Sequence, residues 1–138
     1  MQYTVTHCQQ LNQFYKQHKD KARARPQDLM YAAINEDGVI CAALRLLTYD
    51  DFLFLRSVLT ANKYRNKGIA SNLIKYAVGQ QSCLVYTLPT QSALSLYLRL
   101  GFQTVLKQEF PAQLLANHRR YQRFNNNSSI MVIDSRLR

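Results

Sequence analysis

The chain has 138 residues and a mass of 16.0 kDa, which is the length of one domain, so we expect a single domain over residues 1–138. Its 47% hydrophobic and 19% charged residues are typical of a globular protein and exclude a disordered chain. A formal net charge of +10 indicates an anionic partner, which by composition alone is a nucleic acid, an acidic membrane surface or a small ligand rich in phosphates.

Hydrophobic periodicity predicts an alternating order of strands and helices. Near-continuous apolar strands indicate a sheet whose two faces are both covered by helices. Asp37-Gly38 is a strong turn signal between two strands, and Asp50-Asp51 is expected to turn the next hairpin. The predicted strands are residues 3–7, 29–35, 39–47, 52–60, 83–88, 102–107 and 130–134, and the predicted helices are 11–18, 67–79, 91–100 and 111–119, with a basic connector at 19–26 and a loop at 125–129.

The sequence carries no apolar run near the roughly 20 residues that a membrane-spanning helix needs. Its first residues lack the basic start and apolar segment of a secretory signal, so we expect a cytoplasmic protein that does not bind membranes. The three cysteines and three histidines are spread along the chain without the spacing of metal ligands. This distribution predicts free thiols and no metal site.

The strongest chemical signal lies where the fourth predicted strand leads into the helix that follows. The connecting turn carries Lys63, Arg65, Lys67 and Gly68. Because the first turn of a helix has N–H groups without intrahelical partners and is the positive end of the helix dipole, this turn predicts a phosphate-binding cradle. Its glycine spacing matches neither the Walker pattern nor the dinucleotide fingerprint. An ordinary helix start with solvated basic residues is the alternative.

Two segments of the sequence resemble signatures of one enzyme family. Arg65-Asn-Lys-Gly68-Ile-Ala70 is similar to the R/Q-x-x-G-x-G/A signature of the GNAT superfamily of N-acetyltransferases, and Leu96-Tyr97-Leu-Arg-Leu-Gly101-Phe102 is similar to its L-Y-x-x-x-G-F segment. The strand and helix order also matches over residues 29–134, and the two motifs together are more specific than either alone. The resemblance implies an α/β fold with a mixed, mostly antiparallel central sheet and helices on both faces.

The resemblance also implies acetyl-CoA as the co-substrate and a set of residues that bind it. The turn and helix start would bind the pyrophosphate mainly through main-chain N–H groups, and the preceding strand would pair its backbone with the pantetheine arm. Thr60 stands where the family usually has valine, and Thr90 stands where many relatives carry asparagine. The implied acetyl-CoA-binding residues are Val58, Leu59, Thr60, Arg65, Asn66, Lys67, Gly68, Ile69, Ala70, Ser71 and Thr90.

Tyr97 is the implied general acid, which donates a proton to the CoA thiolate as the amine attacks the thioester. A core tyrosine is the alternative, and the Gly-Phe pair that follows favours catalysis. Phe54 and Arg56 occupy the positions at which some relatives place a glutamate base. Since no general base is evident, the amine would arrive partly deprotonated or lose its proton through water to a backbone carbonyl or a remote group such as Glu109.

Arg45 and Arg56 are the predicted acceptor-binding residues. A two-residue turn at Asp50-Asp51 pairs them directly across the hairpin, where like charges repel and an anion would relieve the repulsion. We therefore expect both arginines to bind a carboxylate or phosphate of the acceptor. The alternatives are that each pairs with an acidic residue such as Asp50, Asp134 or Glu109, or that a longer turn separates them.

The predicted function is transfer of an acetyl group from acetyl-CoA to a primary amine by direct attack in a ternary complex. The short stretch before Leu29 would leave the acceptor side open to a macromolecular amine. Lys19, Lys21, Arg23 and Arg25 would rim that opening.

Three alternatives stay open: a CoA-binding regulatory module without turnover, a nucleic-acid-binding module, and an acyltransferase that uses a longer acyl-CoA. Either a monomer or a homodimer fits the sequence.

Overall fold

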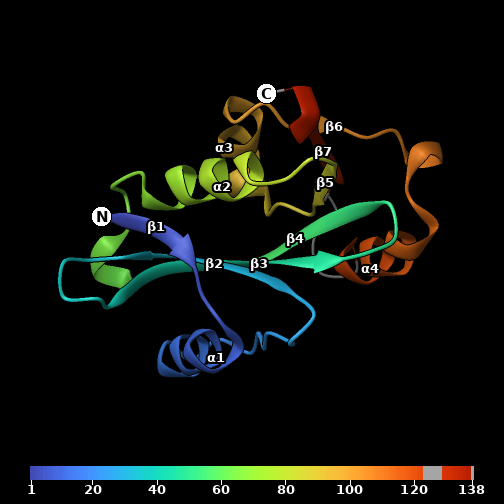
Figure 1. The fold of residues 1–138 in the computed structure, drawn as a ribbon. Helices are drawn as coiled ribbons and strands as arrows, with labels where there is room; N and C mark the ends of the chain where they lie inside the picture. The colour runs from blue at the N-terminus through green and yellow to red at the C-terminus, as the bar shows by residue number, and fades with distance from the viewer. Residues whose placement is uncertain (123–128, 138) are drawn as a thin grey trace.

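The computed structural model describes residues 1–122 and 129–137, which form a seven-stranded sheet with helices packed against it (Figure 1). The predicted loop at 125–129 lies, except for Ser129, outside the described residues. The strands are β1 (Gln2–Val5), β2 (Leu29–Ile34), β3 (Ile40–Thr48), β4 (Phe52–Thr60), β5 (Leu84–Thr87), β6 (Gln103–Thr104) and β7 (Met131–Asp134). The α-helices are α1 (Cys8–Gln17), α2 (Ile69–Gly79), α3 (Leu94–Arg99) and α4 (Ala112–Gln122).

The strand order in the sheet is β1-β2-β3-β4-β5-β7-β6. Neighbouring strands run antiparallel except for β4 and β5, which are parallel because α2 forms the crossover between them. This arrangement confirms the expected α/β fold with a mixed, mostly antiparallel sheet. Figure 1 shows α2 and α3 on one face of the sheet, and α1 and α4 on the other.

The side chains of β4 explain why helices cover both faces. Leu55 belongs to the apolar cluster that contains Leu73 of α2, whereas its neighbour Phe54 belongs to the cluster that contains Leu114 of α4. A third cluster surrounds Tyr15 of α1. Because successive strand residues point to opposite faces, a continuous apolar strand needs a helix on each side, as the sequence indicates.

The hairpin between β3 and β4 turns at two residues, Asp50 and Asp51, since the N–H of Tyr49 donates to the carbonyl of Phe52 at 3.0 Å. Two-residue loops fix the register of the strands that they join. That register places Arg45 directly opposite Arg56. The expected juxtaposition of these two arginines is therefore confirmed.

Two expected elements contain a 3-10 turn that the sequence did not predict. In the strand expected at 102–107, Gln103 and Thr104 pair with β7, and the chain then enters a 3-10 helix at Lys107–Glu109. The helix expected at 91–100 begins with a 3-10 turn at Gln91–Ala93 that leads into α3. Apolar spacing does not separate a 3-10 turn from an α-helical one, because both bring residues three apart to the same side.

Candidate active site

Helix α2 begins at a turn with an uncommon backbone. Asn66 and Gly68 have φ angles of +64° and +76°, in the left-handed region where glycine is unstrained. The carbonyl of Gly68 accepts the N–H of Asn72 at 3.1 Å, so the three residues between them form the first turn. Among the described residues, no side chain caps this end of the helix. We call this end the α2 mouth (residues 65–71), and it presents main-chain donors at the positive end of the helix dipole.

A cavity of about 630 Å³ lies in front of the α2 mouth. Its walls are the end of β4, the first turn of α2, and two residues of α3, Leu96 and Arg99. We call it the donor cavity. Residues predicted to bind acetyl-CoA that line it are Val58, Leu59, Thr60, Arg65, Asn66, Gly68, Ile69, Ala70 and Ser71.

The basic residues in and directly before the α2 mouth are placed differently. Nε of Arg65 donates to the carbonyl of Thr60 at 3.1 Å, which ties the guanidinium to the end of β4 at the donor cavity. The ammonium groups of Lys63 and Lys67 lie 5.3 and 5.8 Å from the ring centre of Tyr64, within cation-π range. Lys67 is exposed, and it stands beside the donor cavity rather than in its lining.

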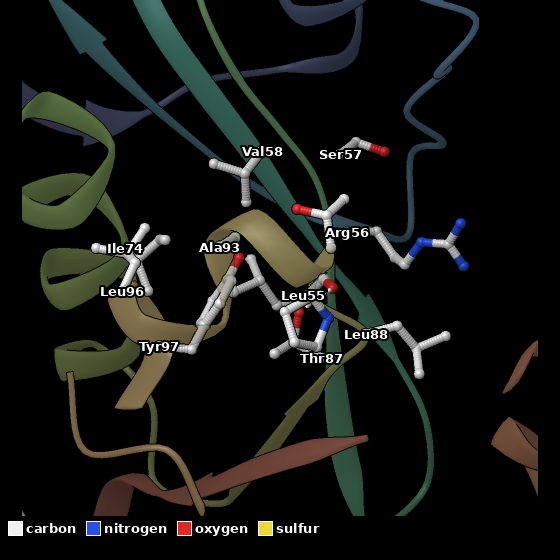
Figure 2. A pocket seen from close by; sticks show the side chains of 12 residues that line it. Leu55, Arg56, Ser57, Val58, Ile74, Thr87, Leu88, Ala93, Leu96 and Tyr97 are labelled. Carbon is white, nitrogen blue, oxygen red and sulfur yellow. Dashed lines mark hydrogen bonds between the residues drawn. The ribbon is translucent and has the colours of Figure 1, made fainter. Parts of the chain in front are cut away.

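A second cavity, of about 290 Å³, opens where β4 and β5 part (Figure 2). Their parallel pairing ends at Leu55 and Thr87, although β4 continues to Thr60. Beyond Leu55 no described strand pairs with β4 on this side, so its backbone edge faces the cavity, which we call the Tyr97 cleft. Val58 and Leu96 line both the cleft and the donor cavity, so the two spaces adjoin at these side chains.

Tyr97 reaches this cleft from α3 (Figure 2). It is 6% exposed, and its ring makes an edge contact with Phe102 at 5.2 Å between centroids. Gly101 has a φ of +98°, which turns the chain at the end of α3 so that the carbonyl of Tyr97 accepts the N–H of Phe102 at 3.0 Å. Gly101 and Phe102 thus fix the position of the Tyr97 ring, and with it the position of the Tyr97 hydroxyl.

A bulge in β4 shapes the wall of the cleft. The register with β3 shifts between Ala43 and Arg45, and Ser57 has a φ of +60°, which a non-glycine residue rarely adopts. The hydroxyl of Tyr15 donates to the carbonyl of Ser57 at 2.7 Å, and Nε of Arg45 donates to the Ser57 hydroxyl at 3.1 Å. These two hydrogen bonds hold an otherwise unfavourable backbone conformation beside the cleft.

Replacing Tyr15 with phenylalanine should lower the free energy of unfolding by about 1–3 kcal/mol, because the Ser57 carbonyl loses its donor. Burial raises the pKa of the Tyr15 hydroxyl well above its ordinary value. The contribution of the hydroxyl is therefore fully present below the ordinary tyrosine pKa of about 10 and is lost as the pH rises above it. Urea unfolding at neutral pH and at about pH 11 checks this. The two proteins should differ less at the alkaline pH, and an equal difference at both would contradict the prediction.

The Tyr97 cleft holds few groups that transfer protons. Among the described residues that line it, the ionisable ones are Tyr97 and Arg56, and an arginine stays protonated at any working pH. Neither a carboxylate nor an imidazole stands among these described residues. Thr90, which was predicted to contact CoA, also lines the cleft, and its hydroxyl shares a hydrogen bond with that of Ser92 at 3.1 Å.

Arg45 and Arg56, the predicted acceptor-binding residues, lie on one face of the sheet but have different partners. Arg45 forms an ion pair with Asp28 at 3.1 Å, and the two side chains are 14% and 3% exposed. Arg56 stacks over the ring of Phe54, 5.1 Å from its centroid, and lines the cleft. Figure 2 shows its guanidinium directed away from Tyr97. The acid that pairs with Arg45 is one that the sequence did not suggest.

Sequence reasoning missed three residues of this region. Tyr64 and Arg99 line the donor cavity, and Asp28 binds Arg45. Arg99 follows Leu96 by three positions and so shares its helix face, which is a signal that helical spacing provides. Tyr64 lies in the predicted turn itself, next to Arg65, whereas Asp28 comes to Arg45 only through the pairing of β2 with β3.

Within residues 1–122 and 129–137, no helix combines the length and the apolar character that crossing a bilayer requires. In the same ranges, no group of three or more His, Cys, Asp or Glu residues is gathered as a metal site would need.

The family model described as "Acetyltransferase (GNAT) domain" matches residues 26–104, more than half of the chain. No protein of curated function matches the sequence. The fold is similar to that of a GNAT-family acetyltransferase from Staphylococcus aureus Mu50, at 14% identity and a TM-score of 0.65, over 97% of this chain and 99% of that one. It is also similar to an aminoglycoside 6'-N-acetyltransferase complexed with coenzyme A, at 11% identity and a TM-score of 0.69, over 98% and 97% of the two chains.

A third similar structure is N-acetylglutamate synthase from Neisseria gonorrhoeae, complexed with coenzyme A and N-acetyl-glutamate. It has 15% identity and a TM-score of 0.66, over 96% of this chain and 35% of that one. At these identities the three structures establish the shared fold. The family match is independent of them, and its segment contains both the α2 mouth and Tyr97. This chain therefore belongs to the GNAT family of acetyltransferases.

Proposed function

We propose that this protein transfers an acetyl group from acetyl-CoA to a primary amine while both substrates are bound. The observation that carries the proposal is that the donor cavity adjoins the Tyr97 cleft along β4, since Val58 and Leu96 line both. A carrier bound by its diphosphate at the α2 mouth would extend along β4 toward the tyrosine. Similar structures hold coenzyme A, which supports this choice of donor.

The α2 mouth fits the diphosphate of such a carrier. Main-chain N–H groups in the first turn of a helix, at the positive end of its dipole, favour anions. Arg65 adds a guanidinium that is already oriented by its hydrogen bond to Thr60, and charge-assisted hydrogen bonds to phosphate are strong. The backbone edge of β4 beyond Leu55 offers donors and acceptors to an amide-bearing arm. Lys67 contributes positive charge from outside the lining.

Tyr97 is the proposed general acid. When the amine nitrogen attacks the thioester carbonyl, the C–N bond forms, the C–S bond breaks, and the leaving thiolate takes a proton from the tyrosine hydroxyl. The nitrogen releases its own proton to water, and exchange with solvent returns a proton to the tyrosine. Because the described lining of the cleft holds no carboxylate or imidazole, the amine enters this step already deprotonated.

Calorimetric titration with acetyl-CoA tests the location of the donor. Replacing Arg65 with alanine should raise the Kd for acetyl-CoA by about tenfold, because one charged hydrogen-bond donor to the diphosphate is lost. The matched control is Lys75→Ala, which removes one exposed cation from the same helix beyond the α2 mouth and should leave the Kd unchanged. Equal weakening by both substitutions would show that only net charge matters and would remove the α2 mouth as the binding site.

A CoA-binding regulatory module is the second candidate. The observation that favours it is the described lining of the Tyr97 cleft, which offers an acid but no carboxylate or imidazole base. Such a module would bind acetyl-CoA at the same mouth without consuming it. Release of free thiol from acetyl-CoA in the presence of a panel of amines separates the two functions, since the regulatory module would release none.

A further inference from the structure

A charged cavity of about 480 Å³ interrupts the face of the sheet that carries α1 and α4. The apolar cluster of α1 lies to one side of it and that of α4 to the other. Between them, β3 and β4 present the facing pair Arg45 and Arg56. The connector before β2 and helix α4 complete the walls. Arginines from all four segments line this space, which we call the arginine cavity: Arg23, Arg25, Arg45, Arg56 and Arg120.

The charge of the arginine cavity is unbalanced. Among the described residues that line it, one acid, Asp28, stands against five arginines. That acid is already engaged, because it pairs with Arg45 at 3.1 Å and accepts the N–H of Arg25 at 2.9 Å. The ion pair with Asp28 offsets the repulsion between Arg45 and Arg56, but a concave site lined mainly by one sign of charge concentrates counter-ions. The arrangement therefore favours a bound anion.

The arginine cavity adjoins the Tyr97 cleft. Arg56 lines both this cavity and the cleft. Figure 2 shows Arg56 and Leu96 on opposite sides of the cleft, and Leu96 is one of the residues shared with the donor cavity. An acceptor with its anionic end among the arginines would therefore approach the cleft from the side opposite to the donor.

We propose that the acceptor is a small primary amine that carries a doubly charged anionic group, either a phosphate monoester or a pair of carboxylates, bound in the arginine cavity. This inference rests on the proposed acetyl transfer and names its substrate class. A cavity of about 480 Å³ has the size of a small-molecule site. Guanidinium groups recognise both anions through paired, charge-assisted hydrogen bonds. The ion pair of Arg45 with Asp28 fixes the position of these two side chains in the cavity wall. Arg56 on β4 and Arg120 on α4 provide positive charge to the anion.

The first experiment measures anion binding without turnover. The protein is saturated with coenzyme A, which occupies the α2 mouth, and is then titrated calorimetrically with inorganic phosphate or with succinate. We expect one of the two anions to bind. Preference for phosphate would identify the phosphate monoester, and preference for succinate would identify the dicarboxylate. If neither anion bound the saturated wild-type protein, the inference would be overturned.

Substitutions of arginines on α4 and β4 test whether the anion binds in the arginine cavity. Arg120→Ala removes an arginine from the cavity wall, whereas Arg119→Ala removes an exposed neighbour outside that lining. The Kd for the anion should rise at least about tenfold in Arg120→Ala and in Arg56→Ala, the loss expected for a charged hydrogen bond. It should stay unchanged in Arg119→Ala. Since Arg119 and Arg120 are both exposed, neither substitution should affect folding. Equal effects of the two would show that only the overall charge attracts the anion.

The second experiment compares amines that differ in charge. 2-Aminoethyl phosphate is tested against ethanolamine, and glutamate against glutamine. In one of these pairs, the amine with the additional anionic group should have a kcat/KM at least about tenfold higher than its partner, mainly through a lower KM. Arg120→Ala should abolish this preference. Anion binding without acetylation of any amine would overturn the transferase function and the acceptor with it. Acetylation of neutral and anionic amines at equal rates would overturn the acceptor class alone.

Discussion

Replacing Tyr97 with phenylalanine is expected to lower kcat for acetyl transfer by about 10²- to 10⁴-fold, the range that proton transfer by a positioned side chain contributes. The buried ring and its edge contact with Phe102 do not depend on the hydroxyl, so the variant should fold normally. The Kd for acetyl-CoA should change by less than about twofold, because in the proposed complex the α2 mouth, and not the tyrosine, binds the diphosphate. Steady-state thiol release together with calorimetry measures both quantities.

Tyr76→Phe is the matched control for this experiment. Tyr76 lies on α2, and its ring packs against Tyr3 and Tyr31 with centroids 6.4 and 6.0 Å away. Loss of its hydroxyl should leave kcat unchanged. If Tyr97→Phe kept kcat within a factor of about three of wild type, the tyrosine would be a packing residue and the thiolate would take its proton from water.

Replacing Ser71 with glutamate should raise the Kd for acetyl-CoA by about 100-fold or more while leaving the fold as stable as before, or slightly more stable. Ser71 is in the first turn of α2 and lines the donor cavity. A carboxylate there repels the diphosphate by several kcal/mol at the effective dielectric constant of a protein surface, of about 20. The same carboxylate interacts favourably with the helix dipole, which contributes about 0.3–1 kcal/mol to helix stability.

Ser71→Gln has nearly the same size as the glutamate variant but no charge, so it separates steric from electrostatic effects. It should weaken acetyl-CoA binding only modestly. Calorimetry gives the two Kd values, and thermal unfolding gives the two stabilities. If the glutamine variant bound as poorly as the glutamate variant, bulk and not charge would explain the loss. Normal binding by the glutamate variant would exclude the α2 mouth as the diphosphate site.

Local patterns in the sequence predicted the placement of many residues of the candidate site. The turn at Asp50-Asp51 predicted that Arg45 faces Arg56, because a two-residue turn leaves a single register between its strands. The α2 mouth could be predicted because its chemistry lies in contiguous residues. The catalytic and binding roles of these residues stay predictions, as do the extent of the domain, the cytoplasmic location and the oligomeric state.

The features of the site that the sequence did not predict depend on contacts between residues that are distant in the chain. Asp28 is 17 positions from Arg45, but it lies two positions before Met30, which pairs with Arg45, so the ion pair is a diagonal contact of the β2–β3 hairpin. The register of that hairpin had to be known to find it, and a turn longer than two residues does not fix the register. The arginine cavity likewise combines residues from the connector, two strands and α4, which lie far apart in the chain. The length of β6 was overestimated, because apolar residues on either side of Gln103 and Thr104 suggested a longer strand, whereas these two residues pair with β7 and Leu106 is 58% exposed before the 3-10 helix begins.

The extra residue that distorts β4 at Ser57 changes which side of the sheet each later side chain faces. Before it, odd-numbered Leu55 points toward α2 and even-numbered Phe54 toward α4; after it, even-numbered Val58 packs on the α2 side and odd-numbered Leu59 on the α1 side. A single strand can therefore present Arg56 to the arginine cavity and, two positions later, Val58 to the donor cavity. Deleting one residue at this point would restore strict alternation and turn Val58 away from the α2 side.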